Sequence, residues 1–228
     1  MQSEINERVL QLRERIAAAA GRAGRLPEGI TLVGVSKRHP VDAVRAAWDA
    51  GIREFGENYV QEAREKCVAL AELSGLRWHL IGGLQSNKAR LAVSLFDTVQ
   101  TVDRLSLAQA LSLEAERINK ELSVLVEVNL AGRAVRVGVA EAESRELCEQ
   151  VAALPYLRLK GLMGIAPLGE SAEAARPHFS RLRQHFEALP DENRKILSMG
   201  MSGDFETAIE EGATLVRIGT ALFGERPS

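Results

Sequence analysis

The amino-acid sequence predicts an α/β fold, a single (β/α)8 TIM-type barrel with an extra N-terminal helix. The first observation is a repeating order of apolar strand, loop and amphipathic helix, which is typical of parallel sheets with helical crossovers. The second is that eight such strands can be counted, as this barrel requires. The third is that no Pro/Gly/Ser-rich linker or internal repeat divides the chain. We therefore expect one domain over residues 1–228, with the barrel at about 30–224.

A leading helix is predicted at about residues 3–23, because Ile5, Val9, Leu12 and Ile16 recur at helical spacing among charged residues. Several of the following strands are apolar on both faces, as expected where helices cover one side and a filled bore lies on the other. The predicted strands are 30–36, 51–56, 77–84, 96–103, 122–129, 157–165, 195–201 and 214–220.

Amphipathic stretches with recognisable ends connect these strands. In the stretch 40–51, Pro40 opens the helix, Asp42 complements its positive end and Gly51 terminates it. The other predicted connecting helices are 57–73, 104–121, 141–154, 172–189 and 204–212, and a short helix follows the last strand.

Composition and charge exclude several classes of function. The 228 residues are 46% hydrophobic and 26% charged with a formal net charge of -2, which argues against disorder and against a nucleic-acid partner. The apolar runs fall far short of the ~20 residues that a membrane span needs, and no secretory signal is recognised. Cys67 and Cys148 form no CxxC pair, so we expect reduced packing cysteines in a soluble, cytoplasmic protein without a membrane partner.

Polar residues at the C-terminal ends of barrel strands are the candidate functional residues. Lys37 follows the apolar run ITLVGV and precedes Pro40, which places it at the barrel mouth. A desolvated lysine amine can form a Schiff base with an aldehyde, whereas the alternative is an ordinary surface lysine. Lys160 on the sixth strand is a rival Schiff-base lysine, and it ranks lower because Arg158 shares its face.

Two loops predict a phosphate site. After the seventh strand, Ser202, Gly203 and Asp204 offer backbone N–H groups, a hydroxyl and the positive end of a helix, although ordinary helix capping explains them equally well. After the eighth strand, Gly219 and Thr220 offer the same chemistry. Because the loops after strands seven and eight of such barrels commonly share one phosphate, the two loops together favour phosphate binding.

Arg217 places a cation in or near the bore, since it lies on the strand face opposite to Val216 and Ile218. A buried cation needs a partner, which could be a carboxylate such as Glu127 or a heteroatom of a ligand. His79 on the third strand is interpreted as a hydrogen-bonded core histidine in preference to a proton-transfer residue.

Seven segments, taken in order, resemble the YggS/PROSC family of pyridoxal 5'-phosphate (PLP) homeostasis or PLP-binding proteins. They are VGVSKRHP, FGENYVQEA, WHLIGGLQSNK, VEVNLAG, GLMGIAP, LSMGMSGDFETAIEEG and VRIGTALFG. The resemblance spans residues 31–224 and implies a barrel similar to the N-terminal domain of alanine racemase. The sequence departs from the family pattern at Arg133 and Arg136, where related chains usually carry an acidic residue and a lysine.

The same resemblance implies that PLP is the cofactor and that the chain holds it as an internal aldimine. It implies the following contacts: the aldimine at Lys37, the phosphate at Ser202, Gly203, Gly219 and Thr220, the pyridine nitrogen at Arg217, and the ring at Asn58 and Met201.

Together with these residues, the resemblance implies a non-catalytic PLP carrier or buffer in vitamin B6 homeostasis. An arginine beside the pyridine nitrogen keeps that nitrogen unprotonated, which weakens the ring as an electron sink. Racemases of this barrel type add a second domain and a further acid/base residue, and we expect neither here because FGERPS follows the last strand and its short helix. We expect a monomer, no metal, and PLP-dependent apoenzymes as candidate recipients. The alternatives are a small PLP-dependent racemase with His79 or a loop residue as second base, and a PLP-independent aldolase that uses Lys160 on a phosphosugar.

Overall fold

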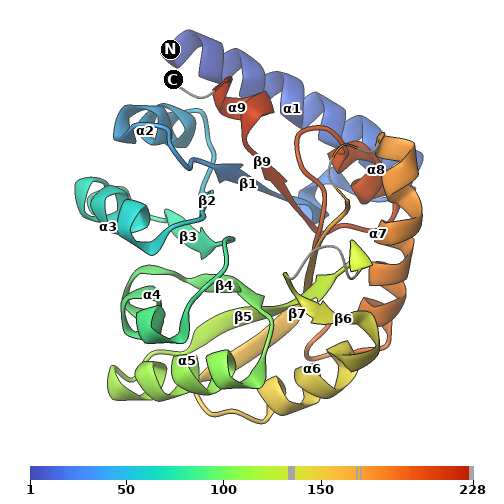
Figure 1. Ribbon diagram of the computed structural model, residues 1–228. Coiled ribbons are helices and arrows are strands. Elements are labelled where there is room, and N and C mark those ends of the chain that lie inside the picture. The colour runs from blue at the N-terminus through green and yellow to red at the C-terminus, as the bar shows by residue number, and fades with distance from the viewer. Residues whose placement is uncertain (133–136, 168, 170, 226–228) are drawn as a thin grey trace.

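Eight parallel strands form a closed barrel with helices around it, as the strand and helix pattern predicts (Figure 1). The computed structural model describes residues 1–132, 137–167, 169 and 171–225. The strand order β4-β3-β2-β1-β9-β8-β7-β5 is closed by pairing of β4 with β5. The barrel strands are β1 (Thr31–Val35), β2 (Glu54–Glu57), β3 (Arg77–Leu80), β4 (Thr98–Val102), β5 (Leu122–Asn129), β7 (Leu157–Ile165), β8 (Ile196–Ser198) and β9 (Leu215–Ile218).

Two features of the sheet differ from the predicted strands. A short strand, β6 (Val139–Ala140), was not predicted, and it pairs in parallel with the end of β5. The predicted strand 195–201 ends instead at Ser198. Gly200 has a φ of 91°, which is incompatible with an extended strand, and this turn moves Met201 into the following loop.

The helices bury one apolar face each against the barrel, as their spacing predicts. The range 89–95 had no predicted helix, because its seven residues are short and no side chain caps their start. The helices are α1 (Gln2–Arg22), α2 (Val41–Asp49), α3 (Val60–Ala69), α4 (Ala89–Leu95), α5 (Leu105–Arg117), α6 (Ser144–Ala152), α7 (Ala172–Glu187), α8 (Phe205–Glu210) and α9 (Thr220–Phe223).

The leading helix α1 lies outside the ring, across α2, α8 and α9 (Figure 1). Its predicted apolar stripe, with Ile5 and Val9 among its members, is buried. On the outer side Arg15 pairs with Glu206 at 2.6 Å and stacks over the ring of Phe205, 4.6 Å from its centroid. The helix is thereby fixed to the last third of the chain.

Both cysteines are free, as predicted. Cys148 is buried and Cys67 is half-buried. Burial raises the pKa of both thiols to about 12, so they remain protonated thiols that pack in the fold.

Candidate functional site

A cavity of about 250 Å³ opens at the C-terminal ends of the barrel strands. It brings together all eight residues that the sequence analysis assigned to a cofactor, and three apolar side chains complete its walls. The lining residues are Val35, Lys37, Asn58, Ile81, Ile165, Met201, Ser202, Gly203, Arg217, Gly219 and Thr220. Residues far apart in the sequence meet here because the ends of parallel strands converge on one mouth of the barrel.

Lys37 lies half-buried in the turn that follows β1. The next residue, Arg38, has a φ of 63°, a left-handed conformation that a non-glycine residue adopts only when its surroundings hold it there. The backbone N–H of Arg38 donates to the carboxylate of Glu62. The turn that carries Lys37 is therefore fixed from α3.

A buried ion cluster lies behind this turn. The ammonium group of Lys66 donates to the carbonyl oxygen of Ser36 at 2.6 Å, to Glu57 Oε1 at 2.7 Å and to Glu62 Oε1 at 2.8 Å. The hydroxyl of Ser36 donates to the same Glu57 oxygen at 2.6 Å. Burial raises the pKa of the Glu57 carboxyl, while Lys66 and Ser36 oppose that rise. The cluster joins the end of β1, the end of β2 and α3 directly behind Lys37.

The sequence analysis did not identify Lys66, and it placed Glu57 at the start of the predicted helix 57–73. A signal was present, because Val60, Ala63 and Lys66 share the three-residue spacing of one helix face. Val60 and Ala63 make that face apolar, so a lysine at the next position on it must be buried and must find a carboxylate. The range predicted for this helix also began too early, since Glu57 still belongs to β2.

Arg217 reaches the cavity from the interior of the barrel and is only 3% exposed. Its guanidinium donates to Ser198 Oγ at 2.5 Å and to the carbonyl oxygen of Gly164 at 2.9 Å. Burial lowers the pKa of Arg217 to about 10, and the nearby carboxyl of Glu127 opposes that shift. Burial likewise raises the pKa of Glu127 to about 7. Glu127, the predicted carboxylate partner, thus acts on Arg217 through electrostatics, whereas the hydrogen bonds of Arg217 go to neutral acceptors.

The loops after β8 and β9 are held together by Ser202, whose hydroxyl accepts the backbone N–H of Ala221 at 3.2 Å. Ser202 therefore caps the start of α9, whereas the capping alternative assigned it to α8, the helix that directly follows it. Asp204 precedes α8, but its side chain makes no hydrogen bond to the first turn of that helix. It accepts the backbone N–H of Met201 at 2.6 Å and so closes the turn 201–204. The two predicted phosphate loops form one wall of the cavity.

Asn58 lies on the wall formed by the end of β2. Its side-chain oxygen Oδ1 is buried and has no hydrogen-bond partner among the residues that the structure describes. The backbone of Asn58 presses against Gly82, where an added Cβ would lie 2.3 Å from the Asn58 carbonyl oxygen. Gly82 was not identified from the sequence, although the Gly-Gly pair at 82–83 marks a close approach of two backbones.

The weaker candidates lie outside this cavity. His79 is 3% exposed and bonded through both ring nitrogens, to Glu54 at 2.5 Å and to Gln100 at 2.9 Å, so its interpretation as a core histidine is confirmed. Lys160 lies at a register shift between β5 and β7, away from the lining residues. Arg133 and Arg136 lie outside the described residues.

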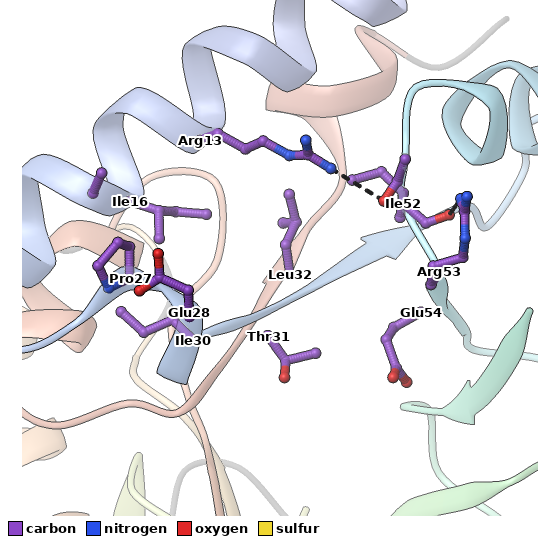
Figure 2. A pocket seen from close by; sticks show the side chains of 12 residues that line it. Arg13, Ile16, Pro27, Glu28, Ile30, Thr31, Leu32, Ile52, Arg53 and Glu54 are labelled. Carbon is purple, nitrogen blue, oxygen red and sulfur yellow. Dashed lines mark hydrogen bonds between the residues drawn. The ribbon is translucent and has the colours of Figure 1, made fainter. Parts of the chain in front are cut away.

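A larger cavity, of about 590 Å³, lies at the opposite, N-terminal end of the barrel (Figure 2). Its two arginines are bonded to backbone carbonyls, Arg13 to Gly51 at 3.1 Å and Arg53 to Ile52 at 3.0 Å. Lys37 and the two glycine-containing loops are at the other mouth, so this cavity takes no part in the candidate site. Over the described ranges no cluster of His, Cys, Asp or Glu side chains could hold a metal ion.

A closed parallel barrel with a cavity at the C-terminal ends of its strands defines a protein of the TIM-barrel class. In agreement, the family described as "Alanine racemase, N-terminal domain" matches residues 10–227. The chain is 49% identical to the pyridoxal phosphate homeostasis protein of Pseudomonas aeruginosa, covering 98% of this chain and 96% of the relative. It is 45% identical to the protein of the same name from Escherichia coli K12, covering 98% and 97%.

The structure is also similar to that of PipY from Synechococcus elongatus, solved with PLP bound. The TM-score is 0.83 at 39% identity, covering 96% of this chain and all of the other. The chain belongs to the family of pyridoxal phosphate homeostasis proteins.

Proposed function

We propose that this protein binds PLP in the Lys37 cavity and acts in vitamin B6 homeostasis as a carrier or buffer of the cofactor. The observation that carries the proposal is that one cavity gathers the amine, the guanidinium and the two hydroxyl-bearing loops that PLP requires. The relatives named as PLP homeostasis proteins and the PLP-bound PipY support the same ligand.

The chemistry of the lining residues fits PLP. Val35, Ile81 and Ile165 offer apolar contacts for a flat ring. The buried Oδ1 of Asn58 is a polar atom that a ligand donor would satisfy. A volume of about 250 Å³ is close to the lower end of the usual range for ligand cavities, ~300–1,000 Å³, and suits a single substituted ring.

We assign each charged end of the ligand to a group in the cavity. Ser202 and Thr220, with the backbones of Gly203 and Gly219, would hold the phosphate. Bound PLP supplies an aldehyde carbon that condenses with a primary amine and releases water. Lys37 is the amine that we assign to this role, because it is the lysine that lines the cavity.

Arg217 is the reason why we propose that the protein binds the cofactor without catalysing a reaction. A guanidinium with a pKa of about 10 stays positive at neutral pH. A second positive charge on a pyridine nitrogen beside it would be repelled, so the nitrogen stays unprotonated and the ring withdraws electrons weakly. The racemase alternative would need a second acid/base residue, and both ring nitrogens of its candidate, His79, are engaged below the cavity.

The setting of this function is part of the proposal. We place the protein in the cytoplasm, which the two free cysteines support because a reducing compartment keeps thiols unpaired. We further propose that it is a monomer, forms one domain over residues 1–228, and passes PLP to PLP-dependent apoenzymes. In the described part of the chain no helix is both long and apolar enough to cross a membrane.

A labelling experiment tests the site. The purified protein is incubated with PLP, the visible absorbance is recorded, and borohydride reduction is followed by peptide mass spectrometry. We expect the PLP mass on the peptide that contains Lys37. The visible absorbance band of bound PLP should be lost in Lys37→Ala and retained in the control Lys160→Ala. Incubation with single L-amino acids should give no D-product. A label on Lys160, no label on the wild-type protein, or efficient racemisation would overturn the proposal.

A further inference from the structure

A continuous chain of side-chain hydrogen bonds crosses the interior of the barrel and ends at Arg217. Arg217 donates to Ser198 Oγ at 2.5 Å, and Ser198 Oγ donates to Gln100 Oε1 at 2.7 Å. Gln100 Nε2 lies 2.9 Å from His79 Nδ1, and His79 Nε2 lies 2.5 Å from Glu54 Oε2. The five side chains come from β9, β8, β4, β3 and β2, so the chain spans the bore from side to side.

This chain of hydrogen bonds is shielded from water along most of its length. Gln100 and Ser198 are fully buried, and His79 and Arg217 are each only 3% exposed. Only the Glu54 end is partly open, at the edge of the cavity shown in Figure 2. Because water does not compete for these groups, each hydrogen bond constrains its neighbours strongly.

The donor direction along the chain follows from chemistry. Arginine can only donate, so Ser198 Oγ accepts from Arg217 and directs its own O–H to Gln100 Oε1. The amide N–H₂ of Gln100 must then face His79 Nδ1, which accepts only when it carries no proton. His79 therefore carries its proton on Nε2 and donates it to the Glu54 carboxylate. A single set of orientations satisfies every member.

The chain has a direct consequence for the orientation of Arg217. Its planar guanidinium is held by two acceptors, Ser198 Oγ through Nη1 and the Gly164 carbonyl through Nη2. Two fixed N–H bonds define the plane of the group and hence where its other N–H groups point. The Ser198 oxygen is in turn oriented by Gln100, and Gln100 by His79.

We propose that His79 and Gln100 are positioning residues for the cofactor site, which they influence through Ser198 by fixing the plane and donor direction of Arg217. This inference rests on the proposed PLP function, because Arg217 is the group assigned to the pyridine nitrogen. It gives a role in the site to residues that do not line the cavity.

The variants Ser198→Ala and Gln100→Met test the proposal, with Ser112→Ala as the matched control. Ser112 is also buried, and its hydroxyl donates to the Pro155 carbonyl at 2.6 Å, but it lies on α5 outside the chain. Thermal unfolding of all three variants verifies folding. We expect Ser198→Ala and Gln100→Met to weaken PLP binding roughly tenfold and to shift the absorbance maximum of bound PLP. Ser198→Ala removes an acceptor of Arg217, and Gln100→Met removes the acceptor that orients the Ser198 hydroxyl. Ser112→Ala should match the wild-type protein in both measurements.

Nitrogen NMR of the ligand-free protein tests, without PLP, whether the chain of hydrogen bonds orients Arg217. We expect the His79 ring to carry its proton on Nε2 in the wild-type protein, and rotation of the Arg217 guanidinium to become faster in Gln100→Met. Failure of the wild-type protein to bind PLP would overturn the proposed function and with it the site role, whereas the NMR result would still decide whether the chain orients Arg217. If the wild-type protein binds PLP but Ser198→Ala and Gln100→Met behave like Ser112→Ala, the positioning role is refuted and PLP binding stands.

Discussion

Replacing Lys66 by methionine tests the buried cluster behind the Lys37 turn. Methionine has a similar length but no charge and no N–H donor. In the wild-type protein Lys66 is 4% exposed, and its ammonium has three oxygen acceptors, contributed by Ser36, Glu57 and Glu62. In the variant, Glu57 Oε1 keeps the hydrogen bond from the Ser36 hydroxyl. The other carboxylate oxygen, Oε2, has no hydrogen-bond partner among the described residues even in the wild-type protein.

The expected loss of stability is large because the substitution strands a buried charge. Removing one member of a buried ion pair costs about 3–5 kcal/mol. For a chain of 150–250 residues, ~1 kcal/mol lowers the Tm by about 2–4 °C, so the Tm of Lys66→Met should fall by roughly 6–20 °C. Because the cluster holds the turn that carries Lys37, we also expect weaker PLP binding.

The loss of stability in Lys66→Met should depend on pH, and the direction of that dependence follows from the pKa of Glu57. Burial already raises the pKa of this carboxyl above 4.5, and removal of Lys66 raises it further. A carboxyl with a raised folded-state pKa contributes stability that is fully present below the unfolded-state value and is lost as the pH rises through the folded-state value. The difference in stability between the wild-type protein and Lys66→Met should therefore be smaller at pH 5 than at pH 8.

Urea unfolding at pH 5 and pH 8 measures both effects. Lys120→Met is the matched control, because the Lys120 ammonium donates to the carbonyl oxygens of Val93 and Phe96, each at 2.8 Å, and its removal strands no bonded carboxylate. The double variant Glu57→Gln/Lys66→Met should recover more than half of the loss. The reasoning is refuted if Lys66→Met loses less than about 1 kcal/mol, if its loss is equal at both pH values, or if the double variant is no more stable than the single one.

Three further predictions concern one residue that lines the cavity and two that act on lining residues. Glu127→Gln removes a carboxyl whose pKa is raised by burial from 4.5 to about 7. Relative to the wild-type protein, the free energy of unfolding of the variant should therefore rise by up to about 3 kcal/mol between pH 5 and pH 8. Urea unfolding that gives the same difference between the two proteins at both pH values would contradict this. Gly82→Ala should displace Asn58 and cost about 1–3 kcal/mol, with weaker PLP binding; Gly83→Ala, where nothing lies within 4 Å of an added Cβ, should leave both unchanged. Ser202→Ala should weaken PLP binding roughly tenfold in an absorbance titration, because a hydroxyl that we assign to the phosphate is lost, and wild-type affinity would exclude Ser202 from that role.

The positions of the candidate site residues could be predicted because they depend on fold class. Once the eight strands are recognised, every strand end is assigned to one mouth of the barrel, and Lys37 and Arg217 fall at or near that mouth whatever their partners are. The end of β8 could not be placed equally well, since a left-handed Gly200 interrupts an apolar run that otherwise reads as a strand.

Contacts across the bore could not be predicted from the sequence. Strand alternation indicates that Ser198, Gln100 and Arg217 point inward, but not which of them meet, because that depends on register and stagger around the closed sheet. The partner expected for Arg217 illustrates this limit. Glu127 is a plausible inward-facing carboxylate in the sequence, yet the hydrogen bonds of Arg217 go to Ser198 and Gly164.

The pairing of β1 with β9 has a consequence for synthesis of the protein. Lys37 follows the first strand and Arg217 lies on the last, and Val33 and Arg217 are partners in the ladder that joins them. A growing chain therefore cannot assemble the cavity until nearly all of it has left the ribosome, and a ligand that binds only the finished barrel stabilises only that state. Bound cofactor would thus stabilise only the fully folded protein. Cells short of vitamin B6 would contain more of the protein in its less stable, ligand-free form.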